Sequence, residues 1–325
     1  MNYMRLNNGV EMPQVGLGTF LIPNNELIRT IREAFELGYR QFDTAWKYNN
    51  EKAISEALKK NGIKREDVFI TTKINAASLN LSPYRYGKMS IFNIPNGKTI
   101  KQAIQESFDN LGTDYIDLFL IHYPYPNADK MWRELEKFYK DGRIRAIGVS
   151  NFLQPHIDAL SEITDIVPAV NQFEISPINT QKALIEFCQN KGIAVQAMST
   201  FSHFRSVKPR DEIIKSDVLI PIADKYKKST VQIVLKWMLQ QNIIIIPKTW
   251  YTPHLKENID IFDFELTDDE MYIIDSMDKG QFLNYNPLGQ QQGFFRKVKN
   301  REEFKEWNES HPSNLFIDLL DKIFN

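Results

Sequence analysis

The chain has 325 residues, of which 42% are hydrophobic and 25% charged, and its formal net charge is -1. This composition is typical of a globular protein, and the balanced charge gives no reason to expect nucleic acid as a partner. No run approaches the ~18 apolar residues of a membrane span, and the first residues lack the apolar region of a signal peptide. Because the only cysteine is Cys188, no internal disulfide can form. We therefore expect a cytoplasmic protein, most simply a monomer.

Short apolar segments alternate with helical ones along most of the chain. The predicted strands, in order, are residues 15–18, 41–43, 68–73, 115–122, 144–150, 169–172, 194–198 and 243–247. The segments between them have apolar residues at helical spacing and end near glycines, as helices commonly do. Thr99 and Gln102 have the spacing of a capping box, and Gly112 is expected to end that helix. The alternation predicts parallel strands with the helices outside the sheet.

The number of repeats decides between two α/β architectures. Eight repeats without a change in composition favour a closed (β/α)₈ TIM barrel, which we expect over residues 1–285. An open doubly wound sheet should carry a glycine-rich phosphate turn after its first strand. Here Gly16-Leu17-Gly18 is followed by Thr19 and Phe20, without the third glycine. The sequence therefore predicts the barrel.

Two segments lie outside the eight repeats. Residues 3–14 contain Asn7-Asn8-Gly9 between short apolar stretches, which predicts an N-terminal β-hairpin plug at one end of the barrel. Residues 286–325 form a C-terminal extension of the same domain. In this extension, residues 315–324 have the apolar spacing of an amphipathic helix, which we expect to cover the flank of the barrel.

Chemically versatile residues follow three neighbouring predicted strands. The carboxyl ends of barrel strands line the active face, and Asp43, Lys73 and His122 stand at such ends, with Tyr48 five residues beyond Asp43. Reduction of a carbonyl by hydride creates an alkoxide, which needs a proton as its charge develops. A free phenol, with a pKa of about 10, is a weak donor at neutral pH. We expect the ammonium of Lys73 to lower the pKa of Tyr48.

The two remaining residues have supporting roles in this hypothesis. Asp43 would keep Lys73 charged and oriented, and His122 would align the carbonyl oxygen through a hydrogen bond. His122 alone would more simply be a structural histidine at the end of an apolar strand. Together with the other three residues it predicts an active site in which Tyr48 is the general acid.

Six motifs, in order and with compatible spacing, resemble the aldo-keto reductase family. They are residues 42–51 (FDTAWKYNNE), 72–73, 120–124 (LIHYP), 148–152 (GVSNF), 171–174 (NQFE) and 246–248 (IPK), and the similarity runs from about Leu6 to Asp275. The resemblance implies a (β/α)₈ barrel that binds NADPH or NADH in extended form without a Rossmann fold. It also implies that Asp43, Tyr48, Lys73 and His122 form the catalytic tetrad for an aldehyde or ketone substrate.

The resemblance further implies a nucleotide site. Ser150, Asn151 and Gln172 would bind the nicotinamide carboxamide, Lys248 and Thr249 the phosphate on the adenosine ribose, and Glu257 and Asn258 the adenine. Gly18, Thr19 and Ser199 would complete the site. Met198 stands where the family usually stacks an aromatic ring under the nicotinamide, although its sulfur can also pack against a ring.

One departure bears on the choice of cofactor. His254 stands where the family usually has an arginine against the adenosine phosphate, and a neutral histidine binds phosphate less well than a guanidinium. Because Lys248 still supplies a charge, we expect NADPH, with NADH possible.

The substrate pocket and the rival functions depend on less specific signals. Phe20, Trp46, Tyr123 and Phe152 are candidate pocket walls, and residues 75–98 are a candidate lid. The five histidines lack metal-ligand spacing, so no metal site is expected. Two alternatives stay open: a dinucleotide-binding regulatory barrel that acts through a protein partner, and a barrel with hydrolytic or isomerase chemistry. The residues expected around the nicotinamide weaken the second.

Overall fold

The computed structural model describes residues 2–74, 98–124, 128–201 and 208–283. Within these ranges, one parallel sheet contains eight strands, each paired with the next in sequence. They are β3 (Leu17–Gly18), β4 (Gln41–Asp43), β5 (Phe69–Ile74), β6 (Ile116–Ile121), β7 (Ile144–Ser150), β8 (Val170–Glu174), β9 (Ala194–Met198) and β10 (Ile243–Ile245). All eight predicted strands are confirmed, with ends that differ by two residues at most.

The two ends of the sheet meet and close the barrel. Val15, just before β3, pairs in parallel with Ile245 of β10. The Gly16 N–H donates to the Ile245 carbonyl at 2.8 Å, and the Gly18 N–H donates to the Pro247 carbonyl at 3.3 Å. The chain has no room for a larger residue than glycine at position 18, since a Cβ there would lie 2.8 Å from the Ile246 carbonyl oxygen. Closure explains why the open-sheet alternative is wrong.

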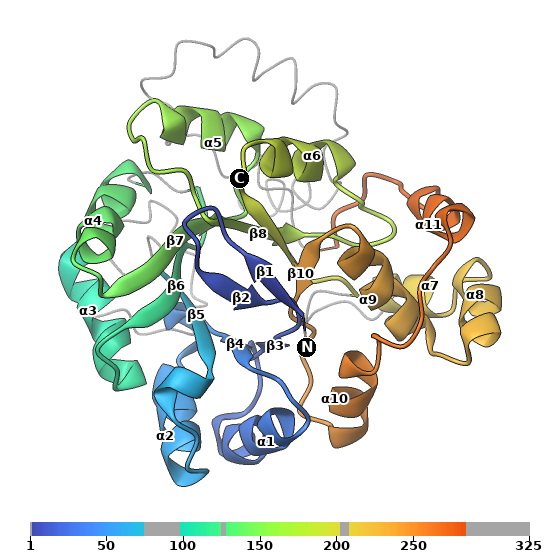
Figure 1. Ribbon diagram of the computed structural model, residues 1–325, viewed down its shortest axis with the longest axis horizontal. Coiled ribbons are helices and arrows are strands. Elements are labelled where there is room, and N and C mark those ends of the chain that lie inside the picture. The colour runs from blue at the N-terminus through green and yellow to red at the C-terminus, as the bar shows by residue number, and fades with distance from the viewer. Residues whose placement is uncertain (1, 75–97, 125–127, 202–207, 284–325) are drawn as a thin grey trace, which may run out of the picture.

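Helices surround the barrel (Figure 1). They are α1 (Asn24–Glu36), α2 (Glu51–Lys60), α3 (Ile100–Leu111), α4 (Ala128–Lys140), α5 (Gln154–Ser161), α6 (Lys182–Asn190), α7 (Lys208–Ile214), α8 (Leu219–Tyr226), α9 (Thr230–Gln240), α10 (Thr252–Ile259) and α11 (Asp268–Asp275), with the short 3₁₀ turns η1 (Trp46–Tyr48) and η2 (Arg65–Asp67). The predicted capping box of α3 is present: the Thr99 hydroxyl accepts from the Gln102 N–H at 3.2 Å and the Gln102 side chain from the Thr99 N–H at 2.9 Å. Gly112 ends this helix in the left-handed conformation, as expected.

The N-terminal hairpin plugs one end of the barrel, as predicted. It pairs β1 (Tyr3–Arg5) with β2 (Glu11–Pro13) and lies across the barrel mouth in Figure 1. Leu6 and Met12 are buried against Phe69, Leu118 and other apolar side chains of the strands. This small cluster fills the hairpin end of the barrel, separate from the larger core between strands and helices. The opposite end, where the strands have their carboxyl termini, is therefore the open face.

The side chains inside the barrel change from apolar to polar along the direction of the strands. Successive side chains of a strand point to opposite faces, so Gln41 and Asp43 of β4 share one face. Near the hairpin, the interior is apolar. Toward the carboxyl ends it becomes polar, with buried Asp43, Lys73, Gln172 and Gln196. A core built only for packing would not place these groups together.

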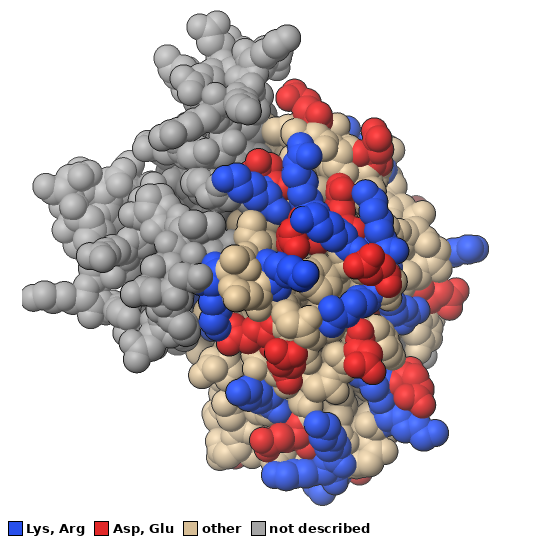
Figure 2. Space-filling model, turned by 90° about the vertical axis from the view of Figure 1, so that its left-hand side faces the viewer, with Lys and Arg blue, Asp and Glu red and all other residues tan. Residues whose placement is uncertain are grey.

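The surface carries both charges. On the face drawn in Figure 2, lysine and arginine side chains are interspersed with aspartate and glutamate. In the ranges that the structure covers, no helix is both long and apolar enough to span a bilayer. The predicted helix at 315–324, the rest of the 286–325 extension and nearly all of the predicted lid at 75–98 lie outside the described residues.

Candidate active site

The predicted catalytic residues come together at the open face. Asp43 ends β4, Lys73 lies near the end of β5, His122 follows β6, and Tyr48 ends η1. The Lys73 Nζ donates to Asp43 Oδ1 at 2.6 Å and to the Thr44 carbonyl at 2.8 Å, and both charged side chains are buried. The Tyr48 ring centre lies 5.2 Å from the Lys73 Nζ and 5.8 Å from the centre of the His122 ring. The phenol, the ammonium, the carboxylate and the imidazole thus form one compact group.

Local backbone structure places Tyr48 beside the ion pair. Directly after β4 the chain enters η1, and Asn49 ends this turn in the left-handed conformation, with φ 53°. Asparagine tolerates this conformation better than most residues. The buried Asn50 side chain donates to the Thr19 carbonyl at 3.0 Å and accepts from the Thr44 hydroxyl. These bonds fix the loop on both sides of Tyr48.

Burial dominates the electrostatics of the phenol. It raises the pKa of Tyr48 well above 10, and the charges of Asp43 and Tyr123 act in the same direction. The net direction is therefore upward, although we expected the charge of Lys73 to lower this pKa. Burial disfavours the charged phenolate, and the negative charge of Asp43 opposes the effect of Lys73. Tyr48 consequently keeps its proton at neutral pH.

The lysine and the histidine are also affected by burial. Burial lowers the pKa of Lys73, while the ion pair and hydrogen bond with Asp43 oppose that shift. Burial, followed by the charges of Lys73 and Lys47, moves the pKa of His122 well below 6.5. His122 is therefore neutral at physiological pH and can donate one hydrogen bond. Its ring stacks on Tyr123, with centres 4.5 Å apart.

The residues expected at the nicotinamide carboxamide form a second group next to the first. The Asn151 amide donates to the Ser150 hydroxyl and to the His122 carbonyl, each at 3.0 Å, and the Asn151 N–H donates to the Gln172 carbonyl at 2.8 Å. Asn151 and Ser199 have φ of 62° and 55°. Left-handed backbone at non-glycine residues is uncommon and often marks functional sites.

Gln172 also contacts the ion pair directly, a contact that the sequence did not predict. Its Nε2 lies 2.8 Å from Asp43 Oδ2 and 2.7 Å from Gln196 Oε1. Gln196, in β9, was not a candidate. The sequence could have indicated it, because Gln196 stands two residues before Met198 and both side chains therefore lie on the same face of the strand.

The comparisons with known proteins show which family the chain belongs to. The model of the Aldo/keto reductase family matches residues 14–279. The chain belongs to this family. A glyoxal reductase of Bacillus subtilis is 39% identical over 287 residues, which cover 87% of this chain and 95% of that protein. A methylglyoxal reductase of Escherichia coli is 33% identical, with 87% and 96% covered.

A solved structure of the same family has the same fold. The aldo-keto reductase of Bombyx mori, solved in complex with NADP, superposes with a TM-score of 0.74 at 32% identity and covers 87% of this chain and 94% of that one.

The residues predicted to bind the adenosine end of the dinucleotide lie after β10 and in α10. Lys248 is exposed and places its Nζ 4.9 Å from the centre of the Trp250 ring. Partial burial of the Lys248 ammonium lowers its pKa, and the charge of Arg210 acts in the same direction. Arg210 is therefore a nearby cation, which the sequence did not predict. His254 is exposed and packs edge-on against Tyr251, with ring centres 5.0 Å apart.

The other residues predicted to bind the nucleotide range from buried to half-buried. Asn258 and Thr249 are buried, and the Thr249 hydroxyl accepts from the Tyr251 N–H at 3.0 Å. Glu257 and Met198 are half-buried. Thr19 is fully buried and its hydroxyl donates to the Asp43 carbonyl at 2.8 Å, which favours a structural role for this side chain.

Three of the four predicted pocket walls lie at the site. Phe20 packs against Tyr48, with ring centres 4.7 Å apart, and Tyr123 stacks on His122. Trp46 lies in η1 with Tyr48, and its Nε1 donates to Glu106 at 2.9 Å. Phe152 instead is fully buried in the main core, with its ring 5.6 Å from that of His156. Its position favours packing over substrate contact.

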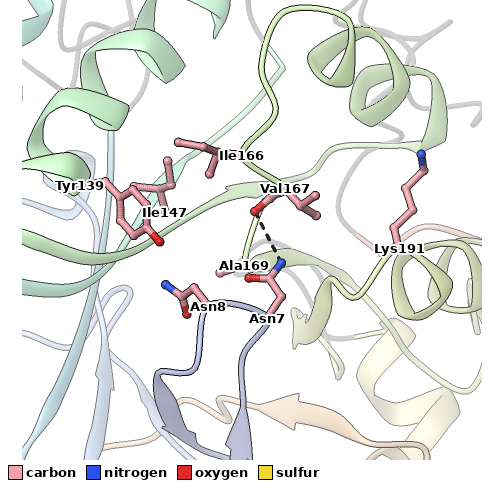
Figure 3. A pocket seen from close by; sticks show the side chains of 8 residues that line it. All are labelled: Asn7, Asn8, Tyr139, Ile147, Ile166, Val167, Ala169 and Lys191. Atoms are coloured by element: carbon pink, nitrogen blue, oxygen red, sulfur yellow. Dashed lines mark hydrogen bonds between the residues drawn. The ribbon is translucent and has the colours of Figure 1, made fainter.

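A pocket of about 360 Å³ lies at the other end of the barrel, beside the hairpin tip (Figure 3). Asn7, Asn8 and Lys191 line it together with apolar side chains. The Asn7 amide donates to the Val167 carbonyl, drawn as a dashed line, and to the Pro168 carbonyl at 3.0 Å. Lys191 pairs with Asp158 at 3.3 Å. Over the described ranges, no group of three or more potential metal ligands occurs.

Proposed function

We propose that this chain reduces the carbonyl group of an aldehyde or ketone with NADPH, and that Tyr48 donates the proton. The observation that carries the proposal is the buried Lys73–Asp43 pair with Tyr48 and His122 beside it. The names of two relatives, a glyoxal reductase and a methylglyoxal reductase, make small oxoaldehydes the first substrates to test.

The donor set fits a nicotinamide dinucleotide. Gln172 Oε1 accepts no hydrogen bond from a described residue, so it can accept one from a carboxamide NH₂. The Ser150 hydroxyl, which accepts from the Asn151 amide, would donate to the carboxamide oxygen. Lys248 and Arg210 would meet the additional phosphate of NADPH, which supports NADPH over NADH despite His254. When bound, the dinucleotide supplies the hydride.

Tyr48 supplies the proton. Because its pKa is raised, the phenol is protonated at neutral pH and can donate to the carbonyl oxygen as negative charge develops there. The phenolate left behind has its ring centre 5.2 Å from the Lys73 ammonium. At an effective dielectric constant of about 20, that attraction is roughly 3 kcal/mol. Lys73 therefore acts on the charge that forms during the reaction.

The other two residues prepare this step. Asp43 keeps Lys73 charged in a buried position where an unpaired ammonium would lose its proton. Neutral His122 donates a hydrogen bond to the carbonyl oxygen and orients it toward Tyr48. Phe20, Trp46 and Tyr123 form apolar walls that limit the access of water.

Turnover with a carbonyl panel tests the proposal. Loss of NADPH absorbance is followed with glyoxal, methylglyoxal, aromatic aldehydes and simple ketones, and the series is repeated with NADH. We expect turnover of at least one class, with NADPH preferred. Tight binding of the dinucleotide without any turnover would favour the regulatory barrel instead, and absence of binding would contradict the cofactor assignment.

A further inference from the structure

A chain of hydrogen bonds crosses the barrel interior from β9 to β5. It runs from Gln196 to Gln172, from Gln172 to Asp43, and from Asp43 to Lys73, with separations of 2.7, 2.8 and 2.6 Å. Each of these four side chains is buried. Gln196 is the last residue of this chain. Among the described residues, it is connected to the Lys73–Asp43 ion pair only through its hydrogen bond with Gln172.

The chemistry of the acceptors fixes the direction of both amides. An ionised carboxylate only accepts hydrogen bonds, so the atom of Gln172 that faces Asp43 must be its nitrogen. The same nitrogen faces Gln196, which must therefore present its oxygen. Amide orientations are often ambiguous, but here one charged acceptor determines two of them. Both hydrogens of the Gln172 amide are then used, and its Oε1 is left as an acceptor.

We propose that Gln196 is a positioning residue for the reaction. By accepting one Gln172 hydrogen, it holds the amide so that the nitrogen orients Asp43 and the Oε1 faces the nicotinamide carboxamide. This inference rests on the proposed function, because it assigns Gln172 to the carboxamide. Without Gln196, the buried Gln172 amide lacks one acceptor and is free to rotate away from this orientation.

A purely structural role for Gln196 makes a different prediction, and Gln41 provides the matched control. Gln41 is also a fully buried glutamine, on the same face of β4 as Asp43. Both of its amide atoms lack a hydrogen-bond partner in the part of the chain that the structure describes. Gln196→Met and Gln41→Met therefore remove the same group from similar surroundings, but only the first removes an acceptor from Gln172.

The experiment measures binding of NADP and of its 3-acetylpyridine analogue, which has a methyl group in place of the carboxamide NH₂. Dissociation constants come from quenching of tryptophan fluorescence, and melting temperatures show that each variant is folded. The native chain should bind NADP about tenfold more tightly than the analogue, because the analogue leaves Gln172 Oε1 unpaired. In Gln196→Met this ratio should fall to about two, and in Gln41→Met it should stay near ten.

Two further variants keep the test decisive. Gln196→Glu retains an oxygen acceptor and should keep most of the discrimination, and Gln196→Leu replaces Gln196→Met if the latter does not fold. An unchanged ratio in the apolar Gln196 variants, or the same loss in Gln41→Met, overturns the inference while the proposed function stands. A native chain that binds neither dinucleotide overturns the proposed function itself.

Discussion

Two buried carboxylates in this barrel have similar partners but different surroundings. Asp117, near the amino end of β6, accepts from Arg65 and Arg145 at 2.6 Å each and from the Ile70 N–H at 2.9 Å. Asp43, at the carboxyl end of β4, accepts from Lys73 at 2.6 Å and from Gln172 at 2.8 Å. Both carboxylates are almost completely buried.

The difference lies in the cations and their neighbours. Arg65 and Arg145 have side chains that are 17% and 44% exposed, and they connect η2 and β7 to β6. Lys73 is completely buried, with the rings of Tyr48 and His122 next to it. A buried ion pair by itself therefore does not indicate function. The proposed function rests instead on the phenol and the imidazole that lie beside the buried Lys73–Asp43 pair.

Asp43→Asn should have the largest effect on catalysis. It removes the charge that keeps Lys73 protonated, so kcat should fall by about 10³-fold. The measurement is turnover of the best carbonyl substrate, with circular dichroism to show that the variant is folded. A kcat within tenfold of the native value would contradict the role of the ion pair.

Asp117→Asn should affect stability and not catalysis. Removal of this charge leaves two arginines without their partner, and because both are partly exposed we expect a loss of about 2–3 kcal/mol in the free energy of unfolding. Urea denaturation measures this loss, and kcat of the folded variant should stay within about twofold. A large fall in kcat would remove the distinction between the two carboxylates.

Arg210→Ala should weaken NADPH binding by about three- to tenfold and leave NADH binding unchanged. Arg210 acts on Lys248 electrostatically, and the two cations together fit the phosphate that only NADPH carries. The dissociation constants of both dinucleotides provide the measurement, with Lys215→Ala as a control at an exposed lysine that pairs with Asp211. Equal losses for both dinucleotides would argue against a phosphate contact.

The smallest expected effect is that of pH. The pKa of Tyr48 lies well above 10, so the proton donor persists as the pH rises to 9, and the pKa of His122 lies well below 6.5, so the neutral ring persists down to that value. We expect kcat/KM to vary by less than about twofold between pH 6.5 and 9. An inflection inside this window would show that Tyr48, His122 or Lys73, whose pKa is lowered by burial, titrates there.

Much of this arrangement could be predicted from the sequence. Apolar alternation predicted eight strands and placed Asp43, Lys73 and His122 at their carboxyl ends, because parallel strands bring those ends to one face. Periodicity does not give atomic distances across a barrel, so the contact between Gln172 and Gln196 could not be predicted. The direction of the Tyr48 pKa shift depends first on how deeply the phenol is buried, which only the geometry shows.

The direction of the Phe152 side chain depends on a local change in the backbone. Its position just after β7 suggested that it faces the pocket. Asn151 has a φ of 62°, however, and the extended backbone ends there, so alternation no longer predicts which way the next side chain points. The Phe152 ring lies in the larger core cluster, next to the ring of His156.

The most direct test of the central claim compares two tyrosines. Tyr48→Phe and Tyr226→Phe each remove one hydroxyl, and that of Tyr226 donates to Glu270 at 2.7 Å, outside the group of proposed catalytic residues. NADPH affinity and the single-turnover rate of carbonyl reduction are measured for both. We expect Tyr48→Phe to bind NADPH within about twofold of the native chain and to reduce the carbonyl at least ~10²-fold more slowly, with Tyr226→Phe unchanged. A Tyr48→Phe variant that reduces the carbonyl at the native rate would contradict the assignment of Tyr48 as the proton donor.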